Sequence, residues 1–213
     1  MKRIFFYVCF ASIILSCNSN EDSQNQDSQE SNFYALTVGN SWVYKNYRYN
    51  PNSEEYDDIG VIDSISIVAL EEIAGNSYFK FRRWTTGNEE GISFCNPNGE
   101  HFEWLREFEG KLINPEGKVK FVNNDIAERL LAEYEYGNIY EALREGTEIL
   151  DVESGTFDCI YSERYLINNS GIQTPGLDRF YYSEGVGLIY ETASFISQSI
   201  PTIIRRLDSY NVQ

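Results

Sequence analysis

The 213-residue chain has little of the residue chemistry on which enzymes most often depend. It contains one histidine, His101, and no Gly-x-Ser-x-Gly elbow, so a serine hydrolase triad is not indicated. No phosphate loop, dinucleotide fingerprint, zinc helix or calcium loop occurs. Glu100 and Glu103 flank His101 as conceivable orienters of a base, although an exposed strand residue is the simpler interpretation. Catalysis by two carboxylates stays open, but the sequence favours a protein with no enzymatic activity, no cofactor and no metal site.

Positive charge is also scarce. Seventeen Lys and Arg residues stand against 33 Asp and Glu residues, which gives a net charge of −16. Removal of residues 1–16 would take away Lys2 and Arg3 and no acidic residue, leaving about −18. Such a field repels nucleic acid and anionic lipid headgroups, so neither is indicated as a ligand.

The chain begins with a short basic region, Lys2 and Arg3, followed by an apolar stretch from Ile4 to Leu15. This stretch has the length of a signal peptide and is too short to span a bilayer as a stable helix. It ends in Ile14-Leu15-Ser16-Cys17, which resembles the lipobox of bacterial lipoproteins. The resemblance implies cleavage before Cys17 and lipid, including palmitate-type acyl chains, on that cysteine. An ordinary secretory signal or an uncut anchor is the alternative.

The segment after Cys17 contains no apolar residue up to Asn32, so it predicts a flexible tether. We therefore divide the chain into a signal peptide (1–16), a lipidated cysteine and tether (17–32) and a single β-rich domain (33–213). Asn18 follows the cysteine where an inner-membrane retention signal would place Asp, so the resemblance implies the outer membrane. The periplasmic face and the cell surface both remain open, and the membrane is a partner through the lipid.

Two cysteines remain after the signal peptide and the lipidation site are set aside, Cys95 and Cys159. In an oxidising envelope they most economically form a disulfide with each other, although free buried thiols are the alternative. A chain-entropy argument gives such a bond about 4 kcal/mol. Asp63-Ser64-Ile65 matches the short pattern at which Bacteroidetes-type envelope proteins are O-glycosylated, which makes Ser64 a candidate acceptor.

Alternation of apolar and polar residues with a period of two runs through most of the domain and predicts β-strands. Trp42 and Tyr44 share one face, and residues 59–67 form a longer run that Asp63 interrupts. Ile92 and Phe94 predict a strand before the turn at residues 95–99. Further turns are expected at residues 114–117 and 153–155. Ten to twelve strands joined by short polar turns imply an antiparallel meander.

One segment departs from this pattern. In residues 124–145, the apolar residues Ile126, Leu130, Leu131 and Tyr134 recur at helical spacing after a candidate cap. We expect a short helix here, with a strand from Leu130 to Tyr136 as the alternative. The predicted fold class is therefore mainly all-β, a curved antiparallel meander or half-barrel with one short helix.

Three segments resemble a group of uncharacterised Bacteroidetes-type lipoproteins: residues 36–44 (LTVGNSWVY), 154–159 (SGTFDC) and 181–190 (YYSEGVGLIY). The resemblance implies a strongly curved sheet similar to the half-barrel of outer-membrane lipoprotein carriers. It implies no catalytic residue. Two functions follow as hypotheses. The first is a binding or scaffolding module for an envelope protein or glycan, and the alternative is a carrier that binds an apolar or lipid ligand in the concave face of the sheet.

Overall fold

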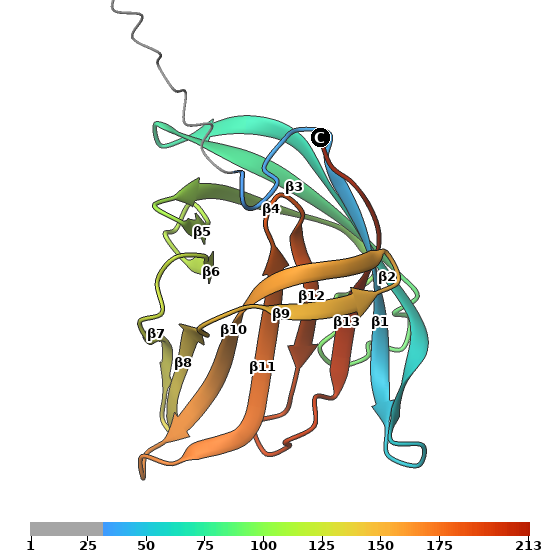
Figure 1. Ribbon diagram of the computed structural model, residues 1–213, viewed down its shortest axis with the longest axis vertical. Helices are drawn as coiled ribbons and strands as arrows, with labels where there is room; N and C mark the ends of the chain where they lie inside the picture. The colour runs from blue at the N-terminus through green and yellow to red at the C-terminus, as the bar shows by residue number, and fades with distance from the viewer. Residues whose placement is uncertain (1–31) are drawn as a thin grey trace, which may run out of the picture. The chain divides into compact units, whose positions relative to one another are not determined.

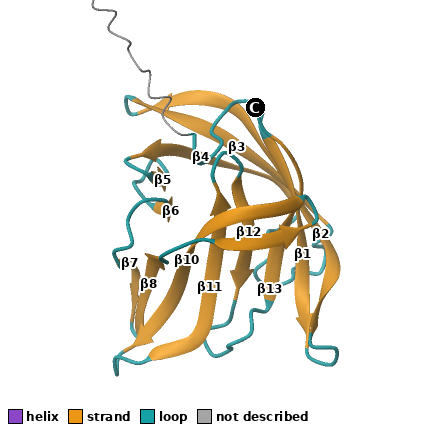
Figure 2. Cartoon of the chain, in the orientation of Figure 1, coloured by secondary structure: helices purple, strands orange, loops and turns teal. Residues whose placement is uncertain are grey.

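The computed structural model describes residues 32–213, which form thirteen β-strands (Figure 1). Within that range there is no helix, as Figure 2 shows, and so none that could cross a membrane. The all-β prediction is confirmed. The strands are β1 (Ser41–Asn50), β2 (Glu55–Ile73), β3 (Asn76–Thr86), β4 (Gly99–Phe108), β5 (Lys111–Ile113), β6 (Val119–Val122), β7 (Arg129–Tyr134), β8 (Gly137–Leu143), β9 (Glu148–Val152), β10 (Gly155–Asn168), β11 (Gln173–Ser183), β12 (Gly187–Ala193) and β13 (Ile203–Asn211).

All thirteen strands belong to one antiparallel sheet in the order β6-β5-β4-β3-β2-β1-β13-β12-β11-β10-β8-β7, with β9 paired to β10 off this path. Both β6 and β7 have a neighbour on one side only, so the sheet is open between them. Two of the expected turns lie where the sequence places them, between β5 and β6 and between β9 and β10. The prediction of a curved meander is therefore correct in outline.

The helix expected in residues 124–145 is wrong. Residues 129–134 form β7 and pair with β8, as the alternative interpretation proposed. Gly137 closes the hairpin with a φ of +150°, and a Cβ there would overlap the backbone of Ile167 on β10. Because β8 is bound to β10 along its whole length, pairing with β8 satisfies the backbone of β7 within the sheet. Tertiary pairing overrides the helical spacing of Ile126, Leu130 and Tyr134, all of which are left exposed.

The strand expected around Ile92 and Phe94 is also absent, because residues 87–98 form a loop between β3 and β4. Side-chain hydrogen bonds hold this loop in place of a strand ladder. Asn88 is buried; its Oδ1 accepts from the backbone N–H of Ile92 at 2.7 Å, and its Nδ2 donates to the carbonyl of Asn96 at 2.8 Å. Asparagine side chains offer the backbone this alternative to secondary structure.

Two hydrophobic clusters stabilise the sheet. β9 and the first half of β10 run across the neighbouring strands (Figure 1). The first cluster contains Phe157 and Cys159 of β10, which pack with Tyr181, Ile189 and Leu207. In the second, Phe33 and Tyr34, which precede β1, pack with Leu105, Leu112 and Phe121 from β4, β5 and β6. The Phe121 ring also stacks on Tyr182 of β11 at 4.1 Å between centroids. The short strands β5 and β6 are therefore tied to the opposite half of the sheet.

Candidate functional site

A cavity of about 630 Å³ lies within the curve of the sheet, and we call it the hollow. Its lining comes from strands at both edges of the sheet, including Val119 and Lys120 of β6 and Leu130, Leu131, Ala132 and Tyr134 of β7. The volume lies in the range of small-molecule sites in proteins. Its aromatic lining residues are Tyr34, Trp42, Tyr44, Phe81, Phe180, Tyr182 and Tyr134, and its aliphatic ones include Leu105, Leu112, Leu130, Leu131, Ile139 and Leu188.

Hydrogen bonds fix the aromatic walls of the hollow. The Trp42 indole Nε1 donates to the carbonyl of Val186 at 2.7 Å, and the Tyr44 hydroxyl donates to the carbonyl of Leu188 at 2.8 Å. The Tyr34 hydroxyl donates to the carbonyl of Gly110 at 2.7 Å. Burial of their rings raises the pKa of the Tyr44 and Tyr34 hydroxyls well above its ordinary value. These groups are therefore neutral donors with fixed positions, and their side chains line the hollow.

Charged side chains form two groups across the same face, which together we call the charge ladder. The first group is Asp63 (β2), Arg205 (β13) and Glu191 (β12), in which Arg205 Nη1 lies 3.3 Å from Asp63 Oδ2 and Nη2 lies 2.5 Å from Glu191 Oε1. The strand register places Glu191 directly opposite Arg205. Opposite charges at directly paired positions stabilise neighbouring strands.

The second group of the charge ladder is Arg164 (β10), Glu141 (β8) and Arg129 (β7). Glu141 lies opposite both arginines in the register, and its oxygens are 2.5 Å from Arg129 Nη2 and 2.7 Å from Arg164 Nη2. The Arg164 guanidinium also lies 4.4 Å from the centre of the Phe180 ring on β11. This ring separates the two groups, because Phe180 is paired in register with Glu191.

Several side chains donate hydrogen bonds to the buried carboxylate of Asp63. Thr85 Oγ1 donates to it at 2.5 Å, while Asn46 Nδ2 and Asn96 Nδ2 each donate at 3.1 Å. Burial by itself would raise the pKa of Asp63, but the charge of Arg205, the hydrogen bonds from Thr85 and Asn46 and the charge of Arg83 hold the pKa below its usual value. Asp63 therefore stays ionised at neutral pH.

The residues singled out from the sequence are dispersed. Cys17 lies outside the described residues. Cys95 in the β3–β4 loop and Cys159 at the start of β10 are both free, so the structure does not contain the disulfide expected between them. Cys159 is buried in the first hydrophobic cluster, whereas the thiol of Cys95 lies in the field of Asp63. Burial raises the pKa of Cys95 to about 11 and that of Cys159 to about 12, which makes both thiols poor nucleophiles at neutral pH.

Ser64 is exposed in the middle of β2, between Val43 of β1 and Trp84 of β3. Its hydroxyl is open to solvent, while the preceding residue of the motif, Asp63, is fully buried. O-glycosylation of Ser64 remains a prediction. The Nε2 of His101 lies 3.0 Å from the carbonyl of Pro97, and Glu103 is paired with Lys120 and not with His101.

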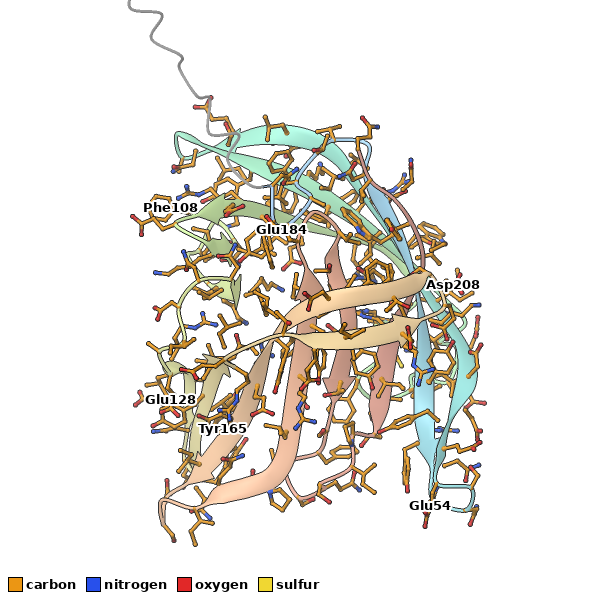
Figure 3. The ribbon with its side chains drawn as sticks, viewed as in Figure 1. Glu54, Phe108, Glu128, Tyr165, Glu184 and Asp208 are labelled. Carbon is orange, nitrogen blue, oxygen red and sulfur yellow. The ribbon has the colours of Figure 1, made fainter. Side chains whose placement is uncertain are left out.

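The charge ladder was not predicted, although the sequence holds one signal for it. Asp63 interrupts an otherwise apolar run in β2, and a charge at a core position of a strand indicates a buried partner. The partner itself could not be identified, since Arg205 lies 142 residues further along the chain. Figure 3 shows how densely side chains cover the sheet. One of those labelled is Tyr165 of β10, whose hydroxyl donates to Glu128, which lies just before β7 in the chain.

Comparison with known proteins identifies the fold but no family. No family model matches the sequence, and no curated protein does either. A crystal structure from Bacteroides fragilis, of a protein assigned as exported and with a YmcC-like fold, aligns with a TM-score of 0.50 and 9% identity over 85% of this chain and 99% of that one. A protein from Parabacteroides distasonis assigned as a lipoprotein aligns over the same shares with 16% identity and a TM-score of 0.45. At 9% identity the likeness to the first of these structures concerns the fold alone.

Proposed function

We propose that this chain is a lipid-anchored lipoprotein of the bacterial outer membrane whose β domain binds a ligand in the hollow. The observation behind the binding role is the hollow itself, with about 630 Å³ of space between fixed aromatic walls and a polar ladder. Sites for small molecules are typically concave and mainly apolar, with a few precisely placed polar groups. The hollow has this combination.

A scaffolding role would be favoured by a sheet whose concave side is filled by its own aromatic side chains. The second cluster does fill one part of this side, through Phe121, Tyr182 and Tyr34. The space that remains beside it is lined by residues from many strands, including both edge strands, β6 and β7. We therefore prefer a ligand within the sheet to a partner on its outside.

The proposal of lipid anchoring rests on the sequence. Ile14-Leu15-Ser16-Cys17 provides the acceptor cysteine, and the polar residues 18–32 provide a tether that keeps the domain clear of the bilayer. The fold likeness to a protein assigned as exported is consistent with an envelope location.

The anchor is tested by metabolic labelling with an alkyne fatty acid in the native host. We expect label on the wild-type protein and on a Cys9→Ala control, and none on Cys17→Ala. Mass spectrometry should place the mature N-terminus at Cys17. An N-terminus upstream of residue 17, or label that survives Cys17→Ala, would contradict the anchor.

The ligand role is tested on the mature chain, residues 17–213, carrying Cys17→Ser so that it stays unlipidated. Native mass spectrometry and displacement of a fluorescent fatty acid measure occupancy of the hollow. Leu131→Trp would place a bulkier side chain on its wall, whereas Leu70→Trp changes an exposed position of β2. We expect loss of binding only for the first variant, and absence of binding to the unaltered chain would refute the role.

A further inference from the structure

The hollow is cationic in an otherwise acidic chain. Six of the 17 Lys and Arg residues line it, against two of the 33 acidic residues, Glu103 and Glu191. The cationic side chains are Arg83, Lys118, Lys120, Arg129, Arg164 and Arg205. The net charge of the chain therefore does not describe this surface. At physiological salt a charge acts over about 8 Å, so a group inside the hollow interacts mainly with these side chains.

Most of these cations are already paired. Lys120 pairs with Glu103, Arg205 pairs with Asp63 and Glu191, and Arg129 and Arg164 share Glu141. Arg83 and the exposed Lys118 differ, since among residues 32–213 neither side chain forms an ion pair. The Nη1 of Arg83 donates to the amide oxygen of Asn96 at 3.1 Å, and Asp63 is the anion that its charge acts on, without forming a direct ion pair with it.

The Nε atoms of Arg83 and Arg205 are both buried, and neither has a hydrogen-bond acceptor. A buried N–H without an acceptor costs free energy, which an oxygen supplied by a ligand would recover. Two guanidinium groups with unused donors thus line one cavity. Arginine presents its donors in a planar fork that matches carboxylate and phosphate oxygens.

Apolar surface adjoins this cationic position. Phe81, two residues before Arg83 on β3, stacks on Trp42 with 6.3 Å between ring centres. Leu105 and Leu112 continue the apolar lining toward β5. A ligand that satisfies both surfaces has an anionic head beside Arg83 and a hydrocarbon part along Trp42, Phe81 and the leucines.

We propose that the hollow binds an amphiphile with an anionic headgroup, a carboxylate or a phosphate on a hydrocarbon chain, and that Arg83 binds the head. This inference rests on the proposed function and names the ligand class for the same site. It differs from the expectation drawn from net charge, because the hollow presents the opposite sign to the chain as a whole.

The test measures the affinity of the unlipidated mature chain for four probes by isothermal titration calorimetry. Each probe is used below its critical micelle concentration. Dodecanoate and dodecyl phosphate combine head and chain, dodecanol has the chain alone, and inorganic phosphate has the anion alone. We expect both anionic amphiphiles to bind at least about tenfold more tightly than dodecanol or phosphate. A preference between the two distinguishes a fatty acid from a phosphorylated lipid as the source.

Arg83→Gln should weaken both anionic amphiphiles by about 10- to 100-fold and leave dodecanol unchanged, since a charge-assisted hydrogen bond is lost. Arg82→Gln is the matched control, because it makes the same change of charge at the next residue of β3, on the opposite face and exposed. It should bind all probes as the parent does. If Arg83→Gln fails to fold, Arg83→Lys keeps the charge without the Nε donor and should give an intermediate loss.

The outcomes separate the two proposals. Equal binding of dodecanol and dodecanoate, unchanged by Arg83→Gln, would overturn the anionic head and leave the ligand site standing. Phosphate binding as tight as that of dodecyl phosphate would overturn the amphiphile. Failure of every probe with a hydrocarbon chain would overturn the proposed function as well.

Discussion

Asp63 and Glu141 are both fully buried in the charge ladder, but their charges are compensated in different ways. Asp63 accepts from three neutral side chains and shares its one arginine with Glu191. Glu141 has two arginines and accepts from no neutral side chain. The comparison separates two ways of compensating the charge of a buried carboxylate, which are three neutral donors with a shared arginine or two arginines alone.

Replacement of Asp63 should have the larger effect. Asp63→Ala removes the acceptor of Thr85, Asn46 and Asn96 and leaves Arg205 with Glu191 alone, in a place that water reaches poorly. We expect the free energy of unfolding to fall by about 4 kcal/mol, as for other broken buried pairs. Urea denaturation measures this, with Asp208→Ala as a control whose partly exposed pair with Lys45 should contribute far less.

Glu141→Gln should cost less, about 2 kcal/mol. The arginine side chains that it leaves are 19% and 32% exposed, against 11% for Arg205, so water can solvate them better. The same urea experiment checks this value. A loss as large as that of Asp63→Ala would show that the two sites do not differ in access to water, and the comparison would fail.

Asp178 on β11 provides a third case, a half-buried carboxylate without an ion pair. It accepts from the backbone N–H of Ser194 at 2.7 Å, and burial raises its pKa to about 6. Because this pKa lies above the ordinary value near 4, ionisation of Asp178 destabilises the fold above pH 6 and has no effect below pH 4. Asp178→Asn should therefore raise the free energy of unfolding by about 1–2 kcal/mol at pH 8 and leave it unchanged at pH 4.

The contribution of Asp63 to stability changes with pH in the opposite direction. Its lowered pKa means that its stabilising contribution is present at neutral pH and is lost as the pH falls below about 4. Urea curves collected from pH 3 to pH 8 on the two aspartate variants and the parent separate the two effects. A parallel response of Asp178→Asn and Asp63→Ala would contradict the assignment.

Local patterns were sufficient to predict much of the sheet. The alternation around Trp42 and Tyr44 gave β1, and the polar segments at residues 114–117 and 153–155 gave two hairpins. These predictions depend only on neighbouring residues, for which a period of two or a turn-forming sequence is direct evidence. The same reasoning failed at Ile92 and Phe94, where the side chain of Asn88 holds a loop.

The site depends on contacts that no local pattern contains. Arg205 meets Asp63 only because β13 pairs with β1 and β1 pairs with β2. Irregularities at Val43/Tyr44 and at Lys45/Tyr47 shift the register of β1 against both neighbours. A shift of one residue would turn Arg205 to the other face of the sheet, so the charge ladder could not be derived from alternation.

The path of the chain through the sheet has a consequence for folding. The strands that come first and last in residues 32–213, β1 and β13, are neighbours in the middle of the sheet, whereas the consecutive strands β6 and β7 are its two edges. The strand order is that of a simple meander, except that the sheet is open between β6 and β7 and is joined between β1 and β13. Two blocks of largely sequential hairpins can form from local contacts, but they join only at the seam between Ser41–Asn50 and Ile203–Asn211. A chain synthesised from its N-terminus therefore cannot complete the centre of its sheet until its final strand has emerged.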